Sequence, residues 1–207
     1  MLYLEIHNEK DGTRMFKCNT RYDWYVAQKA HPVSKTRVVG QDGNTADIFL
    51  PEWKVVPNFM FDEIRSLMAT GDEDACEILQ STSAYDPRRK WVSRQKSGEF
   101  EFPVLYSINR QNTPTMFWSS TKEKGLFGIP KVMYGCGATG FMSDPDGTYG
   151  MTQWCSGIVA PVEEHEAIIK VLGGEQFNKI KLALAVSKAE INTKNLRLFK
   201  KGWWKDM

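Results

Sequence analysis

Apolar and polar side chains alternate from Leu2 to His7, and this period of two predicts a half-buried β-strand. The polar cluster Asn8–Gly12 is typical of a turn, and residues 14–18 follow it as a second short strand-like segment. Residues 20–28 are rich in aromatic and β-branched side chains, which favour a further strand.

A hairpin is predicted next, because the strand-like residues 35–40 and 45–50 flank the pair Asp42-Gly43. Glycine tolerates the positive φ that such tight turns need. The first fifty residues are therefore expected to be mostly β.

Two short helices are predicted in the middle of the chain. Asn58 is a suitable N-cap for a helix over 59–69, which carries apolar residues on one face and is followed by Gly71. Asp72 is placed to cap a second short helix that runs through Leu79.

Residues 86–160 return to a strand-like pattern, with turn-forming residues between four predicted strands: 102–108, 115–119, 131–134 and 153–160. The end of the chain is helical in pattern, first over 163–172 and then over 177–186. The fold class expected is α+β, with an antiparallel or mixed β-sheet core, a short helical pair in the middle and helices at the C-terminus. We expect two parts, a β-rich part over 1–85 and an α+β part over 86–207.

Composition limits the classes of protein that fit. The 207 residues are 42% hydrophobic and 25% charged, which is typical of a globular protein and unlike collagen or a disordered chain. No apolar run is long enough for a membrane span, and the first residues lack the pattern of a signal peptide. A cytoplasmic protein is expected.

No metal site or bound cofactor is expected from the sequence. Its four cysteines lie far apart and its three histidines do not form pairs at the spacing of zinc ligands. We expect free thiols at Cys18, Cys76, Cys136 and Cys155.

Charge is unevenly distributed, although the net charge is only +2. Residues 46–77 carry a net charge of −6, whereas residues 86–131 and residues 175–207 each carry +5. A basic face separated from an acidic segment indicates a polyanionic partner such as nucleic acid. A merely solvated charged surface is the alternative.

Three short motifs suggest chemistry but lack the context that it requires. The glycines in 135–140 match a dinucleotide fingerprint, yet Pro145 and Gly147 soon follow where a helix should begin. Glu52 and Lys54 match part of a nuclease motif, and Ser119 with Lys122 matches part of a serine-hydrolase motif, but the companion elements are missing. A small-molecule enzyme is therefore the weakest interpretation.

The segment 88–96 interleaves basic residues with Trp91 and hydrogen-bonding side chains. Lysine and arginine neutralise phosphates, and arginine or glutamine can read base edges in the major groove. Trp91 is expected either to stack on a base or to anchor its loop to the core. Polar clusters at 109–112 and 122–125 lie in further loops between strands.

Several stretches in order along nearly the whole chain resemble one family, the adenine-specific DNA methyltransferases of restriction–modification systems, including viral members. The similarity is to their C-terminal portion, the target-recognition domain. The matching stretches are Ile6-His7-Asn8, residues 20–26, 90–93, 102–107, 127–132, 149–153 and 199–205.

This resemblance implies that residues 2–28 correspond to the last hairpin of the catalytic sheet, and that residues from about 86 onward grip DNA and read its sequence. The Asp/Asn-Pro-Pro-Tyr/Phe motif that holds a flipped adenine in the family is absent from these residues, as is the glycine-rich S-adenosylmethionine loop. No catalytic residue is therefore assigned, and methyl transfer is expected to need a separate methyltransferase catalytic chain.

The function expected is sequence-specific binding of double-stranded DNA, as a recognition subunit or fragment of an adenine-N6 DNA methyltransferase. The alternative is a structural or interaction protein that does not bind DNA and forms a homodimer through an aromatic-rich surface. The basic C-terminal residues, including Lys205, are expected to add non-specific attraction. The candidate DNA-binding residues are Arg88, Arg89, Lys90, Trp91, Arg94, Lys96, Arg110, Lys122, Lys124, Lys131, Lys200 and Lys201.

Overall fold

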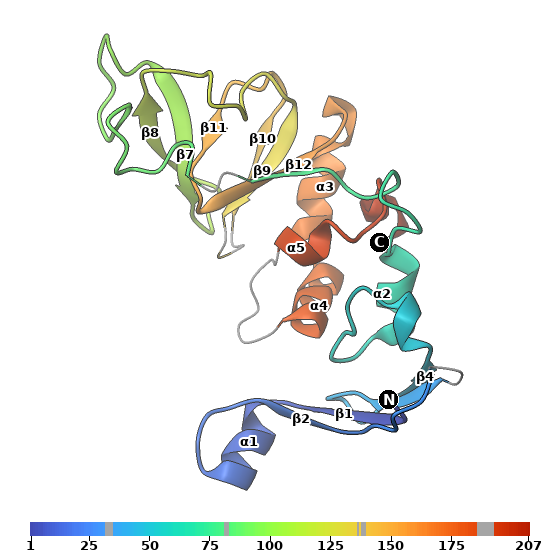
Figure 1. The fold of residues 1–207 in the computed structure, drawn as a ribbon. Coiled ribbons are helices and arrows are strands. Elements are labelled where there is room, and N and C mark those ends of the chain that lie inside the picture. Colours follow the sequence, from blue (N-terminus) through green and yellow to red (C-terminus); the bar gives the residue numbers. More distant parts are fainter. Residues whose placement is uncertain (32–34, 81–82, 136, 138–139, 186–192) are drawn as a thin grey trace. The chain divides into compact units, whose positions relative to one another are not determined.

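The structure is a computed structural model that describes residues 1–31, 35–80, 83–135, 137, 140–185 and 193–207. The fold is α+β, as expected, with three four-stranded sheets and five α-helices in the described residues (Figure 1). The chain divides into two compact units, Met1–Ser66 with Ile180–Ala189, and Leu67–Lys179 with Glu190–Met207. The boundary that the sequence placed between residues 85 and 86 therefore falls inside the second unit.

The first unit contains a mixed sheet in the order β2-β1-β3-β4. β1 pairs antiparallel with β2 and parallel with β3, and β3 pairs antiparallel with β4. The Asp42-Gly43 hairpin is confirmed, with Gly43 at a φ of +80° in the turn. The strands are β1 (Tyr3–His7), β2 (Tyr22–Val26), β3 (Thr36–Val39) and β4 (Thr45–Ile48).

The turn and strand expected at residues 8–18 are wrong, because Glu9–Phe16 forms helix α1. The Asn8 side chain accepts hydrogen bonds from the N–H groups of Lys10 and Asp11, and the Asp11 carboxylate accepts one from the Asn8 N–H. This reciprocal cap satisfies N–H groups that have no partner inside the helix. Gly12 lies against Thr20, where a Cβ would come within 1.8 Å of the carbonyl oxygen, so its lack of a side chain permits the packing.

The core of the first unit lies against one face of its sheet, where Ile6, Val38 and Ile48 pack with Phe61. Phe61 begins helix α2 (Phe61–Leu67), which confirms the helix expected over 59–69. The Asn58 side chain donates hydrogen bonds to the carbonyls of Leu182 (3.1 Å) and Ala185 (2.8 Å). The N-cap role expected of Asn58 is therefore wrong: α2 begins three residues later, and Asn58 supports the carboxyl end of the helix Glu175–Leu184.

The second unit contains two sheets. In the first, of order β10-β9-β12-β5, all strand pairs are antiparallel; in the second, of order β11-β7-β8-β6, only β11 and β7 are parallel. The strands are β5 (Ile78–Gln80), β6 (Val92–Ser93), β7 (Phe102–Ile108), β8 (Pro114–Ser119), β9 (Lys131–Gly135), β10 (Phe141–Asp144), β11 (Gly150–Met151) and β12 (Cys155–Val159). The four strands expected between residues 86 and 160 are thereby confirmed.

Side chains from both sheets form one apolar cluster, in which Leu105, Met133 and Met151 have no exposed surface. Helix α3 packs on β9 and β10. The C-terminal helices are confirmed as α3 (His165–Leu172) and α4 (Glu175–Leu184), followed by the short α5 (Thr193–Leu196). Three 3-10 helices complete the fold, at Leu50–Glu52, Val162–Glu164 and Trp203–Asp206.

The second helix expected in the middle of the chain, from Asp72 to Leu79, is wrong. Residues 71–75 form turns, and Ala75 then pairs with Lys200 while the Cys76 N–H donates to the Phe199 carbonyl (2.7 Å). Long-range pairing thus takes the backbone groups that a helix would have used, and the segment enters β5 instead.

Some sequence predictions lie outside the described residues, namely Cys136, Val186 and part of the 135–140 glycine motif. The other three cysteines are free thiols, as expected. Strand β10, not a helix, comes after the glycine motif, which agrees with our rejection of a nucleotide site. Within the described residues, none of the helices has the length and apolar character needed to cross a membrane.

Candidate nucleic-acid interface

Two basic loops of the second unit meet beside β6, the outer strand of the sheet β11-β7-β8-β6. The first loop leads into β6 and ends at Trp91, and the second follows β8. The Trp91 carbonyl accepts a hydrogen bond from the Ser120 N–H (3.0 Å), and the Tyr85 hydroxyl accepts one from the Lys124 N–H (3.2 Å). The Trp91 indole N–H donates to the Ala84 carbonyl (2.9 Å). These bonds hold the two loops side by side.

Trp91 anchors this arrangement through its ring as well. The Arg89 guanidinium lies 5.6 Å and the Lys124 ammonium 5.3 Å from the centroid of the indole. The Lys122 ammonium lies 5.8 Å from the Phe102 ring. A cation at this distance from an aromatic ring is attracted by the ring quadrupole, which is negative at the ring face. We call Trp91 with Arg89, Lys90, Lys122 and Lys124 the Trp91 cluster.

Two further cations follow along the same sheet. The Arg94 guanidinium lies 5.8 Å from the ring of Phe117, and the Lys96 ammonium lies 4.9 Å from the ring of Trp118. Phe117 is buried and stacks on Tyr106 at 4.7 Å between centroids. Because Phe117 and Trp118 are neighbours on β8, they point to opposite faces of the sheet. Arg94 therefore lies on the face that carries Phe102 and Phe117, whereas Lys96 lies on the other face.

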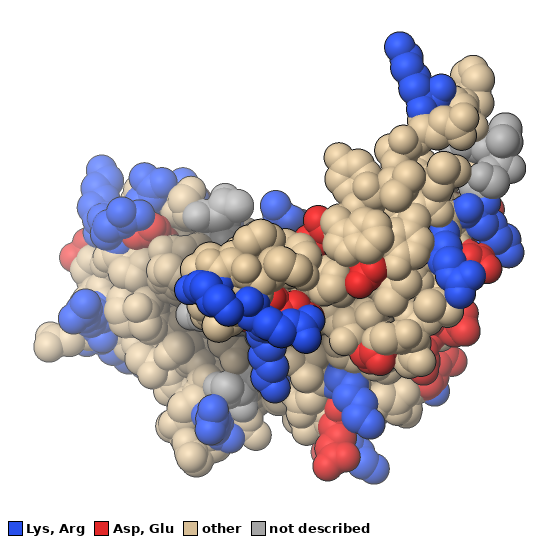
Figure 2. Space-filling view, turned by 90° about the horizontal axis from the view of Figure 1, so that it is seen from below, with Lys and Arg blue, Asp and Glu red and all other residues tan. Residues whose placement is uncertain are grey.

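Six exposed cations of this region have no carboxylate partners among the described residues. They are Arg89, Lys90, Arg94, Lys96, Lys122 and Lys124. In the face that Figure 2 shows, Lys and Arg side chains form several separate groups, with Asp and Glu side chains near some of them. Local clusters, rather than one uniform basic face, therefore carry the positive charge in this view.

Arg88 is different from its neighbours, because its guanidinium is bound to the carboxylate of Asp86 through Nε (2.9 Å) and Nη2 (2.7 Å). The Arg88 side chain holds the pKa of the Asp86 carboxyl well below its usual range by these hydrogen bonds. The pair stays ionised at neutral pH, and the buried Asp86 carboxylate balances the charge of the exposed Arg88 side chain.

Lys131 is withdrawn from the candidate DNA-binding residues. Its side chain is completely buried and forms an ion pair with Asp144, its cross-strand neighbour on β10. Asp144 also accepts hydrogen bonds from the N–H groups of Thr148 (2.7 Å) and Tyr149 (3.1 Å). Lys131 therefore neutralises a buried carboxylate and cannot reach a phosphate.

The remaining candidates lie apart from the Trp91 cluster. Arg110 is exposed in the β7–β8 turn, at the end of that hairpin opposite Lys122. Lys200 forms an ion pair with Asp206 (2.9 Å) and Lys205 with Glu164 (2.6 Å).

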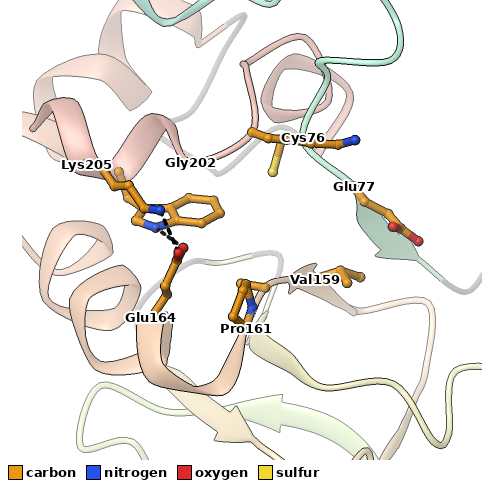
Figure 3. Close-up of a pocket in the computed structure, with 10 residues that line it drawn as sticks. Cys76, Glu77, Val159, Pro161, Glu164, Gly202 and Lys205 are labelled. Atoms are coloured by element: carbon orange, nitrogen blue, oxygen red, sulfur yellow. Dashed lines mark hydrogen bonds and ion pairs between the residues drawn. The ribbon is translucent and has the colours of Figure 1, made fainter.

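Lys201 is exposed and lines a pocket of about 400 Å³ in the second unit. Its other lining residues are Cys76, Glu77, Val159, Ala160, Pro161, Glu164, Gly202, Trp204 and Lys205 (Figure 3). The sequence analysis did not predict this pocket.

Two polar groups of the pocket, the Cys76 thiol and the Glu164 carboxylate, have pKa shifts that disfavour their use in catalysis. Burial raises the pKa of the Cys76 thiol to about 11, so the thiol is protonated at neutral pH and is a poor nucleophile. The Glu164 carboxylate accepts hydrogen bonds from Lys205 and from the Trp204 indole N–H (2.9 Å). These contacts, led by that of Lys205, lower the pKa of Glu164, which makes it a poor proton acceptor.

Other polar residues singled out in the sequence have structural roles. The Ser119 hydroxyl is buried and lies 2.7 Å from the Thr121 carbonyl, and Glu52 forms an ion pair with Arg65 (2.7 Å). His165 is buried between the Ser143 hydroxyl (2.7 Å) and the Ala160 carbonyl (3.2 Å). In the part of the chain that the structure describes, no group of three or more His, Cys, Asp or Glu residues is arranged to hold a metal ion.

Comparison of the chain with the characterised protein families and with curated proteins finds no match to either. The geometry of the site therefore carries the functional argument.

Proposed function

We propose that this chain binds double-stranded DNA through the Trp91 cluster, extended along the same face of the sheet by Arg94. The observation that supports the proposal is the convergence of two loops whose cations have aromatic neighbours but no carboxylate partners among the described residues. Binding to phosphates releases counterions, so unpaired cations contribute more to DNA affinity than those already in ion pairs.

Trp91 has a supporting role in this proposal. Its indole N–H is bound to the Ala84 carbonyl and two cations lie near its ring. It holds the loop and the cations in place, rather than stacking on a base. Gln95 is exposed next to Arg94 and, with it, is the side chain best suited to read base edges in the major groove.

The biological setting we propose is recognition of a target sequence for an adenine-N6 DNA methyltransferase. The resemblance of the sequence supports this setting, and these residues lack the catalytic motif of the family. In this proposal the chain selects the site, and the partner chain supplies the S-adenosylmethionine site and the base-flipping pocket.

DNA binding is tested by fluorescence anisotropy with a labelled duplex of about 30 base pairs, titrated at several salt concentrations. We expect the double substitution Arg89→Gln/Lys124→Gln to weaken binding on the order of tenfold. It should also reduce the slope of log affinity against log salt by about 2, because each phosphate contact contributes about 0.9.

The matched control is Lys10→Gln/Arg14→Gln, which removes the same charge from α1 in the first unit, where both side chains are exposed. The control should retain the affinity and the slope of the unaltered protein. An equal loss of DNA affinity in the two variants would show that binding depends on net charge alone and would overturn the assignment to the Trp91 cluster. Absence of DNA binding by the unaltered protein would overturn the whole proposal.

Sequence recognition needs a separate measurement. Selection from a pool of random duplexes should enrich one sequence, and Arg94→Ala or Gln95→Ala should relax the preference at one or two positions of it. Enrichment of no sequence would overturn the recognition role while leaving non-specific DNA binding in place.

A further inference from the structure

The first unit leaves a group of large apolar side chains in solvent. Trp24, Tyr25 and Val26 on β2 are 45%, 61% and 47% exposed, and Met15 and Phe16 at the end of α1 are 61% and 54% exposed. Leu2 of the adjoining segment is also exposed. Phe16 contacts Tyr22 of β2 (5.0 Å between ring centroids), on the face that also carries Trp24 and Val26, whereas Tyr25 lies on the opposite face. Neighbouring exposed apolar side chains mark interaction surfaces, whereas single ones need no explanation.

Strand β2 also has a backbone edge that pairs with no other strand among the described residues. It is the outermost strand in the order β2-β1-β3-β4, and its five residues pair with β1 in an unbroken register from Tyr3↔Val26 to His7↔Tyr22. Natural proteins usually protect such edges with lysine, proline, a bulge or a very short strand. Its sequence, Tyr-Asp-Trp-Tyr-Val, contains neither lysine nor proline, and the register has no bulge.

The two faces of β2 differ in chemistry, because neighbouring residues of a strand point to opposite faces. Tyr22, Trp24 and Val26 share one face, where Tyr22 stacks on His7 (4.3 Å between centroids) and Trp24 contacts Tyr3 (4.9 Å). The opposite face of β2 carries Asp23 and Tyr25.

We propose that two copies of this chain associate by pairing their β2 strands antiparallel about a two-fold axis at Trp24. In that register Trp24 faces Trp24 of the second copy, and Tyr22 faces Val26, so that one face becomes a continuous aromatic and aliphatic row. On the other face Asp23 lies opposite Tyr25, whose hydroxyl can donate to the carboxylate. The two four-stranded sheets would become one sheet of eight strands.

A second copy is the occupant that fits this edge, because the strand is complementary to itself. Every apolar position meets an apolar or aromatic one, and the one acidic position meets a hydrogen-bond donor. The flanking charged residues also avoid like charges, since Arg21 would lie opposite Ala27 and Lys29 opposite Asn19. A two-fold contact of this kind closes on itself, and it leaves β4 as the outer strand at each end of the joined sheet.

The dimer can form without DNA, but it would also contribute to the proposed DNA binding. A two-fold dimer carries two Trp91 clusters, which is the arrangement by which many dimeric proteins read palindromic DNA.

Sedimentation equilibrium measures the association directly. We expect a mass twice that of the 23.7 kDa chain at micromolar concentrations, with dissociation on dilution. Trp24→Lys places two charges face to face and should raise the dissociation constant on the order of 100-fold. Trp154→Lys is the matched control, since Trp154 is 52% exposed in the second unit, and should leave association unchanged.

Disulfide trapping tests the register in a Cys18→Ser background, which removes an exposed native thiol. Trp24→Cys should form a dimer under mild oxidation, because side chains opposite each other lie about 5 Å apart at Cβ. Tyr22→Cys should not, because its predicted neighbour is Val26.

A monomer at all concentrations up to about 100 µM would overturn the proposal, as would a dimer that Trp24→Lys leaves intact or that Tyr22→Cys cross-links as well as Trp24→Cys. Circular dichroism shows whether each variant is folded. A loss of association counts as evidence only when the variant is folded. DNA binding is measured on the same variants. A monomeric variant that still binds DNA would show that dimerisation and DNA binding are independent properties.

Discussion

The two units of this protein bury different shares of their large aromatic residues. In the second unit, Tyr85, Phe199 and Trp203 have no exposed surface, and Trp203 lies within 5.4 Å of both Phe177 and Phe199, measured between ring centroids. In the first unit, Phe16 and Trp24 are about half exposed. The same residue class therefore stabilises one unit and is available for binding in the other.

The cause of the difference lies in how each sheet is covered. The second unit has two sheets that share an apolar cluster, and α3 packs on β9 and β10. The core of the first unit lies on one face of a single sheet, and its outer strand β2 is mostly exposed. An aromatic residue is buried only where a second layer of structure covers it.

The largest expected effect tests this comparison directly. Trp203→Ala removes a fully buried indole and should lower the free energy of unfolding by about 3–5 kcal/mol, because it leaves a cavity between packed rings. Phe16→Ala removes a half-exposed ring and should cost less than about 1 kcal/mol. Urea denaturation followed by circular dichroism measures both, and equal losses would contradict the contrast between the units.

The next effect compares Lys131 and Lys124, which lie seven residues apart in the sequence. Lys131→Met should lower the free energy of unfolding by about 3 kcal/mol, because the Asp144 carboxylate stays buried without its cation. Lys124→Met removes an exposed charge and should change it by less than about 0.5 kcal/mol. If Lys131→Met were as harmless as Lys124→Met, the buried ion pair would not be a stabilising element of the second unit.

The smallest effect concerns pH. The Lys205 and Trp204 contacts lower the pKa of Glu164 in the folded protein, so their contribution is present above the unfolded pKa near 4.5 and is lost as pH falls through the folded value. Lys205→Met should therefore make the midpoint of thermal unfolding less sensitive to acid between pH 6 and pH 3. Calorimetry of both proteins at several pH values measures this difference, and parallel profiles would contradict it.

Much of the fold followed from local patterns. The Asp42-Gly43 pair predicted its hairpin, and the strands around residues 102–108 and 131–134 were recognised by apolar and β-branched runs. Helix α1 was missed although its signal was present, since Asn8 and Asp11 have the spacing of a reciprocal cap. Gly12 obscured that signal, because glycine disfavours a helix unless close packing requires it.

The candidate site was predictable in part. The charge pattern identified the basic loops, but it could not distinguish an exposed Lys124 from a buried Lys131 seven residues away. The difference depends on Asp144, which is thirteen residues from Lys131 in sequence and directly opposite it in the sheet. The pocket around Cys76 and Glu164 was not predictable, because its walls come from three distant segments.

The amino-acid sequence alone determined the α+β class, most strands and helices, and the basic character of two loops, because these depend on neighbouring residues. The tertiary structure alone decided which cations remain unpaired, which aromatic residues are exposed, and that β2 is an outer strand. Burial and ion pairing depend on residues that are distant in the chain and meet only in the folded protein.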